Sequence, residues 1–119
     1  MYEHEPKPQP LTLAFIGYNE AQTRQHFIEF ARVNTDQVSH FDDREGRIRL
    51  TDGTLILRVP NDRHRLIGCR FDQVIVAVDR RGVNSWPEER LVLMGKVYER
   101  TLCSRVPIQF ITIIYNLFY

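Results

Sequence analysis

The chain has 119 residues, of which 43% are hydrophobic and 26% are charged, and its formal net charge is +1. These values are typical of a globular domain that buries its own core. The near-zero net charge argues against a uniform field for binding nucleic acid or membranes. No apolar run approaches the roughly 20 residues of a membrane-spanning helix, and the first ten residues lack the apolar core of a secretory signal. We therefore expect a cytoplasmic protein.

Charge is unevenly distributed along the chain. Residues 1–43 hold three basic and seven acidic residues, whereas residues 44–81 hold nine arginines and five acidic residues. Lys7 and Lys96 are the only lysines among the 16 basic residues. The excess of arginine has two explanations, a GC-rich genome or the use of guanidinium groups for phosphate binding and stacking. The segregation predicts a bipolar surface.

The N-terminal part begins with a proline-rich arm, residues 1–10, which we expect to be flexible. An apolar strand is predicted at residues 11–16. Asn19 then caps a helix that ends near Asn34, and Gln22 stands at the capping-box position. The expected inner face of this helix carries Thr23, Phe27, Phe30 and Ala31.

Three strands are predicted in the middle of the chain. Two of them, residues 47–51 and 54–59, are joined by Asp52-Gly53. Because glycine takes a positive φ at low cost, this dipeptide between two apolar runs is typical of a β-hairpin. Residues 73–78 are almost all β-branched or apolar, which predicts a strand buried on both faces.

A second helix is predicted after Ser85, which is expected to cap it, with Pro87 in the first turn and Glu88 at the capping-box position. Its expected inner face consists of Leu91, Met94, Gly95, Tyr98 and Leu102. Pro107 ends this segment, and residues 108–114 form a last apolar strand. The predicted order is therefore β-α-β-β-β-α-β.

Strands that are apolar on both faces and alternate with helices indicate one three-layer α/β domain with a mainly parallel sheet. We expect this single domain to span residues 11–119. The hairpin at Asp52-Gly53 adds an antiparallel edge to the sheet.

One segment, from Arg47 to Asp79, combines a strand pair, a basic stretch and an apolar strand that ends at an aspartate. Within it, an L-x-G-x-R-x-D pattern is formed by Leu66, Gly68, Arg70 and Asp72. The segment resembles the one that leads into the Walker B strand of P-loop NTPases, above all the large terminase and helicase ATPases. The resemblance implies a Walker-B-like position for Asp79 and a viral or mobile-element origin.

The chain also departs from that family. It contains no G-x-x-x-x-G-K-[ST] loop to cradle phosphates, and Asp79 is followed by Arg80 rather than by glutamate. The resemblance then implies a degenerate core without its catalytic half, and we expect no cofactor. The alternative is that Asp79 is a strand-end residue paired with an arginine.

Arginines gather on both sides of the strand predicted at residues 73–78. Arginine side chains bind phosphate bidentately, and the candidate binding residues, for phosphate or protein, are Arg58, Arg63, His64, Arg65, Arg70, Arg80 and Arg81. Loops at the two ends of one strand lie at opposite edges of a sheet, so we expect two separate groups. One comprises the residues from Arg58 to Arg70 before the strand, and the other comprises Arg80 and Arg81 after it. The alternative is a solvated surface with salt bridges.

No catalytic or metal-binding group is predicted. The carboxylates considered for a two-metal nuclease site are Asp42, Asp43, Asp52, Asp72, Asp79 and Glu88. Asp72 and Asp79 bracket one strand and lie about 23 Å apart at roughly 3.3 Å per residue, too far to share a metal. Cys69 and His64 are close in sequence, but no third group orients them. Neither Cys69 nor Cys103 has a ligand spacing typical of zinc.

The C-terminal segment is rich in apolar residues. Its candidate interface residues are Ile113, Leu117, Phe118 and Tyr119. An apolar strand at a sheet edge must be covered, and pairing with a second copy or a partner protein would cover it. The alternative is a strand inside the sheet. We expect a non-catalytic binding or regulatory domain that acts by protein–protein contact. The alternatives are a DNA-binding accessory protein that uses the arginine loops, and a metal-dependent nuclease or other phosphoester enzyme.

Overall fold

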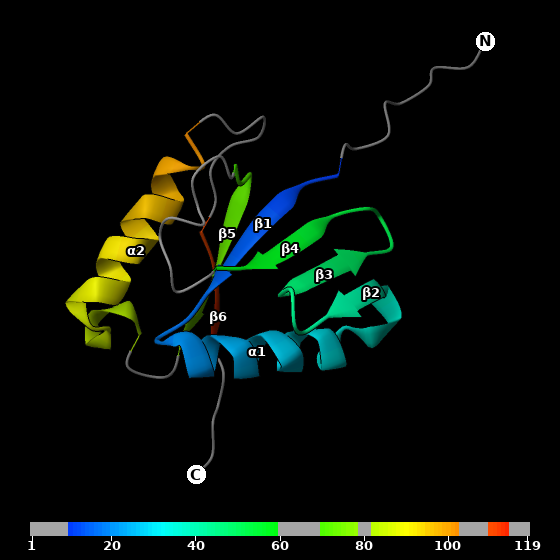
Figure 1. Ribbon diagram of the computed structural model, residues 1–119, viewed down its shortest axis with the longest axis horizontal. Helices are drawn as coiled ribbons and strands as arrows, with labels where there is room; N and C mark the ends of the chain where they lie inside the picture. Colours follow the sequence, from blue (N-terminus) through cyan, green and yellow to red (C-terminus); the bar gives the residue numbers. More distant parts are fainter. Residues whose placement is uncertain (1–9, 60–69, 79–81, 103–109, 115–119) are drawn as a thin grey trace.

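The computed structural model describes residues 10–59, 70–78, 82–102 and 110–114. Its centre is a six-stranded sheet with the strand order β2-β3-β4-β1-β5-β6 (Figure 1). The strands are β1 (Thr12–Ile16), β2 (Val38–Asp42), β3 (Arg47–Leu50), β4 (Leu55–Arg58), β5 (Gln73–Val78) and β6 (Phe110–Ile114). The helices are α1 (Glu20–Val33), α2 (Glu88–Glu99) and the short 3-10 helices η1 (Thr35–Gln37) and η3 (Val83–Ser85).

The sheet combines two kinds of strand pairing. Strands β4, β1, β5 and β6 run parallel to one another, whereas β2 and β3 pair antiparallel, as do β3 and β4. The α/β class is confirmed, but the sheet is mixed rather than mainly parallel. The predicted order β-α-β-β-β-α-β is also wrong, because Val38–Asp42 forms an additional strand. We call β2, β3 and β4 the antiparallel wing.

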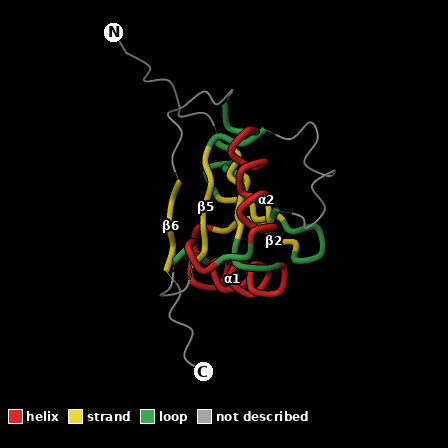
Figure 2. The backbone as a smooth tube through the Cα atoms, turned by 90° about the vertical axis from the view of Figure 1, so that its left-hand side faces the viewer, coloured by secondary structure: helices red, strands yellow, loops and turns green. Residues whose placement is uncertain are grey.

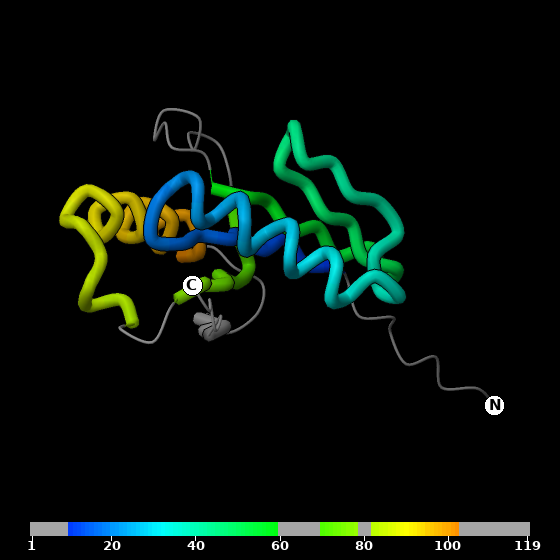
Figure 3. The backbone as a smooth tube through the Cα atoms, turned by 90° about the horizontal axis from the view of Figure 1, so that it is seen from below, coloured from blue at the N-terminus to red at the C-terminus, as the bar shows by residue number. Residues whose placement is uncertain are grey.

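The first helix forms where the sequence predicts it. The Oδ1 atom of Asn19 accepts the N–H of Gln22 at 2.8 Å, which confirms the N-cap. Figure 3 shows α1 running from the end of β1 toward β2. Its Phe27 side chain is fully buried, and the ring meets that of Phe15 edge-on with 5.3 Å between centroids. This contact holds α1 against one face of the sheet.

The two faces of the sheet carry separate hydrophobic cores. Leu13 and Phe15 of β1 pack in the core under α1, whereas Ala14 and Ile16 pack in the core under α2. Successive side chains of a strand point to opposite faces, so the two α-helices cover opposite faces of the sheet. Helix, sheet and helix thus form three layers.

Helix α2 differs from the prediction in both its start and its orientation. It begins at Glu88 after Pro87, and Ser85 lies in η3, where its hydroxyl donates to the carbonyl of Gly82 at 2.9 Å. The predicted cap at Ser85 is therefore wrong. The predicted inner face is wrong as well, since the buried residues are Arg90, Leu93 and Val97. Of the five residues expected inside, Met94 is half-buried and the others, Leu91, Gly95, Tyr98 and Leu102, are exposed.

The predicted hairpin is present between β3 and β4, with Gly53 at a φ of 90°. The two outer strands of the described sheet are β2 and β6. Figure 2 shows β6 beside β5 and outermost in the sheet. The last predicted strand is thus an edge strand rather than an interior one.

Candidate functional site

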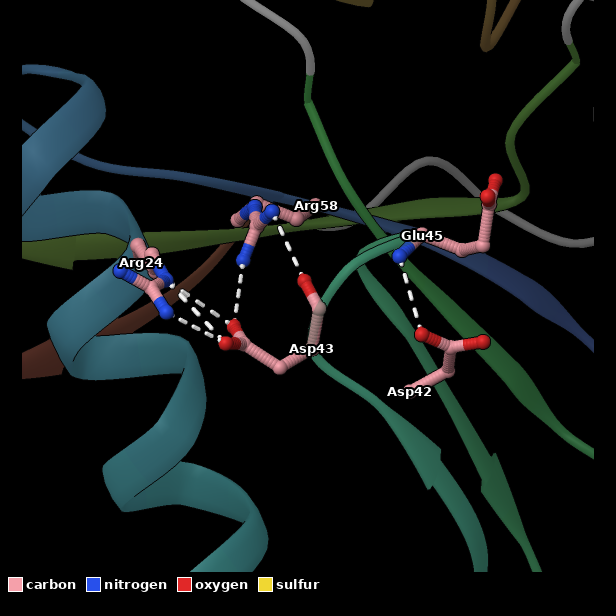
Figure 4. A network of polar contacts seen from close by, with 5 residues as sticks. All are labelled: Arg24, Asp42, Asp43, Glu45 and Arg58. Atoms are coloured by element: carbon pink, nitrogen blue, oxygen red, sulfur yellow. Dashed lines mark hydrogen bonds and ion pairs between the residues drawn. The ribbon is translucent and has the colours of Figure 1, made fainter.

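A network of charged groups connects α1, the turn between β2 and β3, and the end of β4 (Figure 4). The Asp43 carboxylate accepts hydrogen bonds from Nε and Nη2 of Arg24, the shortest at 2.6 Å. Arg58 donates from Nη1 to the same carboxylate at 3.1 Å and from Nη2 to the Asp43 carbonyl at 3.0 Å. These bonds hold the pKa of the Asp43 carboxyl below its usual range, first through Arg24 and then through Arg58.

Arg58 has a further contact that fixes its position. Its guanidinium carbon lies 5.6 Å from the centroid of the Phe27 ring, a geometry that favours cation–π attraction. Its side chain is only 19% exposed, whereas that of Arg24 is 59% exposed. Arg58, a predicted binding residue, therefore holds the turn and helix α1 together.

Arg70, another of the predicted binding residues, does not lie near Arg58. Strands β4 and β5 are both parallel to β1, so Arg58 at the end of β4 and Arg70 before the start of β5 lie at opposite edges of the sheet. The prediction that these two arginines belong to one group is therefore wrong, because Arg58 follows its strand and Arg70 precedes the next one. Arg70 is exposed. The remaining members of the two predicted groups lie outside the described residues, as does Asp79, for which a Walker-B-like position was predicted. They are Arg63, His64, Arg65, Arg80 and Arg81.

The candidate carboxylates within the described residues do not converge. Asp42 accepts the N–H of Glu45 at 3.0 Å, and Asp52 accepts that of Thr54 at 2.9 Å. Asp72 accepts the N–H of Thr12 at 2.9 Å, at the opposite edge of the sheet from Asp43. Across the described ranges, no three His, Cys, Asp or Glu side chains are placed to hold a metal ion. These contacts give three of the carboxylates structural roles in turns and strand ends.

The turn between β1 and α1 lies at the carboxyl edge of the parallel strands, where doubly wound folds bind ligands. Here the N–H of Gly17 donates to Thr23 Oγ1 at 2.9 Å, and the N–H of Thr23 donates to the Asn19 carbonyl at 2.9 Å. Arg90, which is 4% exposed, donates from Nη2 to the Gly17 carbonyl at 3.0 Å. Burial lowers the Arg90 pKa, yet an arginine stays charged in proteins. The turn is thus closed by its own contacts and by α2.

The outward side of α2 carries an exposed apolar stripe, which we define as Leu91, Gly95, Tyr98 and Leu102. Leu91, Gly95 and Tyr98 follow one another at intervals of four and three residues. This spacing places them on one side of a helix with about 3.6 residues per turn. Leu102 follows in the turn after the helix. The exposed fractions are 38% for Leu91, 42% for Tyr98 and 60% for Leu102. The sequence pattern predicts that these residues face the core, because most of them are apolar, whereas the structure exposes them.

The interface predicted at the C-terminal strand is described only in part. Ile113 lies in β6, in register with Ala77 of β5. The other predicted interface residues, Leu117, Phe118 and Tyr119, lie outside the described residues. Strand β6 contains no charged residue, whereas the opposite edge strand, β2, contains Asp42 and an irregular register between Val38 and His40. Charges and bulges protect sheet edges from pairing, so β2 is the better protected edge.

None of the helices in the described residues is long and apolar enough to cross a membrane. The sequence matches no protein-family model and no curated protein, and the fold matches no solved structure.

Proposed function

We propose that this chain is a non-catalytic binding domain that acts by protein–protein contact, and that it associates with a second copy of itself through the α2 stripe. The observation that carries the proposal is the exposure of Leu91 and Tyr98 on one side of α2, with Leu102, also exposed, in the turn after the helix. Exposed apolar residues that cluster, rather than occurring singly, are typical of contact sites.

A second copy fits this stripe because the stripe is complementary to itself. If two α2 helices pack antiparallel about a two-fold axis, Leu91 meets Leu102 of the other copy and Gly95 meets its Tyr98. A Cβ atom placed on Gly95 would have no heavy atom within 4 Å, so the space above this glycine can receive an aromatic ring. Contacts of this reciprocal kind define a two-fold interface.

The contact is short. Leu91 and Tyr98 are seven residues apart, which is roughly 10 Å along α2, and Leu102 adds only the turn after the helix. An interface of this length belongs to the small, weak class. We therefore expect a dimer that forms and dissociates as the protein concentration changes.

Sedimentation-velocity measurements over a wide concentration range test the proposal. Gly95→Gln fills the space above residue 95, while glutamine is a better helix former than glycine. We expect this variant to stay monomeric at concentrations where the natural chain dimerises, with an equal or higher midpoint of thermal unfolding. Loss of association together with retained stability would separate an interface effect from misfolding.

Leu102→Glu and Val33→Glu form a matched pair for the same measurement. Both residues are exposed and apolar, but Val33 ends α1 and is 64% exposed. Leu102→Glu should abolish the dimer and Val33→Glu should not. A natural chain that stays monomeric throughout, or two variants that associate equally well, would contradict the proposed surface.

The β6 edge is a second candidate surface for contact with another copy. Four of its five residues are apolar and none is charged, so pairing with a second β6 brings no like charges together. If association survives Gly95→Gln and Leu102→Glu but is lost with Ile113→Lys, the contact lies at β6 instead of α2.

A further inference from the structure

The antiparallel wing carries two arginines that no predicted site includes. Arg47 and Arg49 flank Ile48 on β3, and Ile48 is fully buried in the core under α1. Because neighbouring side chains of a strand point to opposite faces, Arg47 and Arg49 share the face that is turned away from α1. Both are exposed.

The strand register identifies the neighbours of these arginines. On β2, His40 is opposite Arg49 and Asp42 is opposite Arg47. On β4, Leu55 and Leu57 occupy the matching positions. The charged and titratable groups in register on this face are therefore two arginines, one histidine and one aspartate.

The two guanidinium groups are available to an outside ligand. Arg47 and Arg49 take part in none of the ion pairs formed within the described part of the chain. The Asp42 carboxylate, the one acidic group in register with them, accepts the backbone N–H of Glu45. The arginines are thus two exposed cations held on a paired strand.

We propose that this face binds the phosphate backbone of a nucleic acid duplex. Arginine forks match phosphate oxygens bidentately, and residues two apart on a strand are separated by roughly 7 Å, a distance comparable to that between successive phosphates. Contacts of this kind position a protein on a duplex without reading its sequence. Both arginines lie on β3, apart from the α2 stripe.

The position of Phe41 favours a duplex over a single strand as the ligand of this face. Phe41 of β2 is in register with Ile48 and packs near Phe27 under α1, with 6.1 Å between ring centroids. The aromatic ring of β2 is thus on the opposite face from Arg47 and Arg49. Single-strand binding sites use exposed aromatic rings as stacking platforms, and strands β2, β3 and β4 place none beside these arginines.

Fluorescence anisotropy with a labelled DNA duplex of arbitrary sequence tests the proposal. The double variant Arg47→Ala/Arg49→Ala is compared with Arg32→Ala/Lys96→Ala, which removes the same charge from α1 and α2. We expect the first variant to bind about tenfold or more weakly at low salt and to reduce the slope of log affinity against log salt by about two. The matched control should change the affinity less than twofold.

Three results would overturn the inference. One is equal weakening by both double variants, which would mean that net charge and not this face governs binding. Another is no measurable binding of the natural chain at low salt. The third is tighter binding of a single-stranded oligonucleotide through the same arginines. Thermal unfolding of both variants checks that each is folded, which is expected because all four side chains are exposed.

Discussion

Two glycines of this chain should respond in opposite ways to the same substitution. A Cβ atom on Gly17 would lie 2.9 Å from Thr23 Oγ1 and 3.3 Å from Thr23 Cα. The first distance is shorter than real Cβ contacts, and the second involves backbone of α1. The backbone of Gly17 also forms two hydrogen bonds: its N–H donates to Thr23 Oγ1, and its carbonyl accepts from Arg90 Nη2. The turn therefore has little freedom to relax around an added methyl group.

Overpacking of this kind costs about 1–3 kcal/mol, so Gly17→Ala should lower the free energy of unfolding by that amount. Gly95 stands inside α2, and a Cβ there meets nothing within 4 Å. Gly95→Ala should therefore raise the free energy of unfolding by about 1 kcal/mol through helix propensity alone. The two variants are expected to differ by about 2–4 kcal/mol, which is roughly 4 °C in the unfolding midpoint for each kcal/mol.

Urea titration followed by circular dichroism measures the free energy of unfolding of both variants, at a protein concentration low enough that the chain is monomeric. If the free energy of unfolding of Gly17→Ala is within about 0.5 kcal/mol of that of the natural chain, a range usual for surface substitutions, the turn between β1 and α1 is not closely packed and this reasoning is refuted. A destabilised Gly95→Ala would show that the outward side of α2 is packed, and it would remove the basis of the α2 stripe.

Three other predictions concern α1 and its contacts. Asn19→Ala leaves the N–H of Gln22 without its cap and should destabilise the chain by about 1 kcal/mol; an unchanged urea midpoint would contradict the cap. Phe27→Ala opens a cavity in the core under α1 and should cost about 3–5 kcal/mol, measured by the same titration. Because hydrogen bonds from Arg24, and then from Arg58, lower the pKa of the folded Asp43 carboxyl below its usual value, this carboxylate stabilises the chain above its usual pKa, and its contribution is lost as the pH falls through the folded pKa. Asp43→Asn should therefore flatten the dependence of stability on pH in the acid range, and an unchanged dependence would exclude this role.

Local sequence rules were sufficient for the elements in which one physical effect dominates. Strand β5 is apolar on both faces, so its burial follows from composition alone. The start of α1 depends on one side-chain acceptor, Asn19, and that bond forms as predicted. The Asp52-Gly53 turn needs a positive φ, which glycine supplies. None of these features requires knowledge of a distant part of the chain.

The orientation of α2 could not be derived in the same way. Two apolar stripes run along the helix, and the buried one includes Leu93 and Val97 next to a buried arginine, Arg90. Charged residues are rarely buried, so the sequence pattern predicts that the α2 stripe, which has no charged residue, faces the core. In the structure, the Gly17 carbonyl accepts hydrogen bonds from Nε and Nη2 of Arg90, so the charged group on the buried side has a partner. That partner is distant in sequence and invisible to helix periodicity.

Strand β2 was missed for a related reason. It is an edge strand whose residues are mostly exposed, so it lacks the apolar alternation that marks a half-buried strand. Its pairing with β3 depends on the hairpin that β3 already forms with β4. The proposed phosphate-binding face also could not be predicted from the local sequence. Arg47 and Arg49 belong to one surface only because Ile48 is buried under α1.

The two proposed surfaces predict a joint effect that neither predicts alone. A dimer formed through α2 carries two copies of the Arg47 and Arg49 face, and a duplex long enough to reach both binds with a higher effective affinity than a short one. Gly95→Gln should therefore weaken binding to a long duplex and leave binding to a short duplex unchanged, because Gly95 is on α2 and the arginines are on β3. An equal effect on both lengths, or none on either, would show that self-association does not contribute to nucleic acid binding.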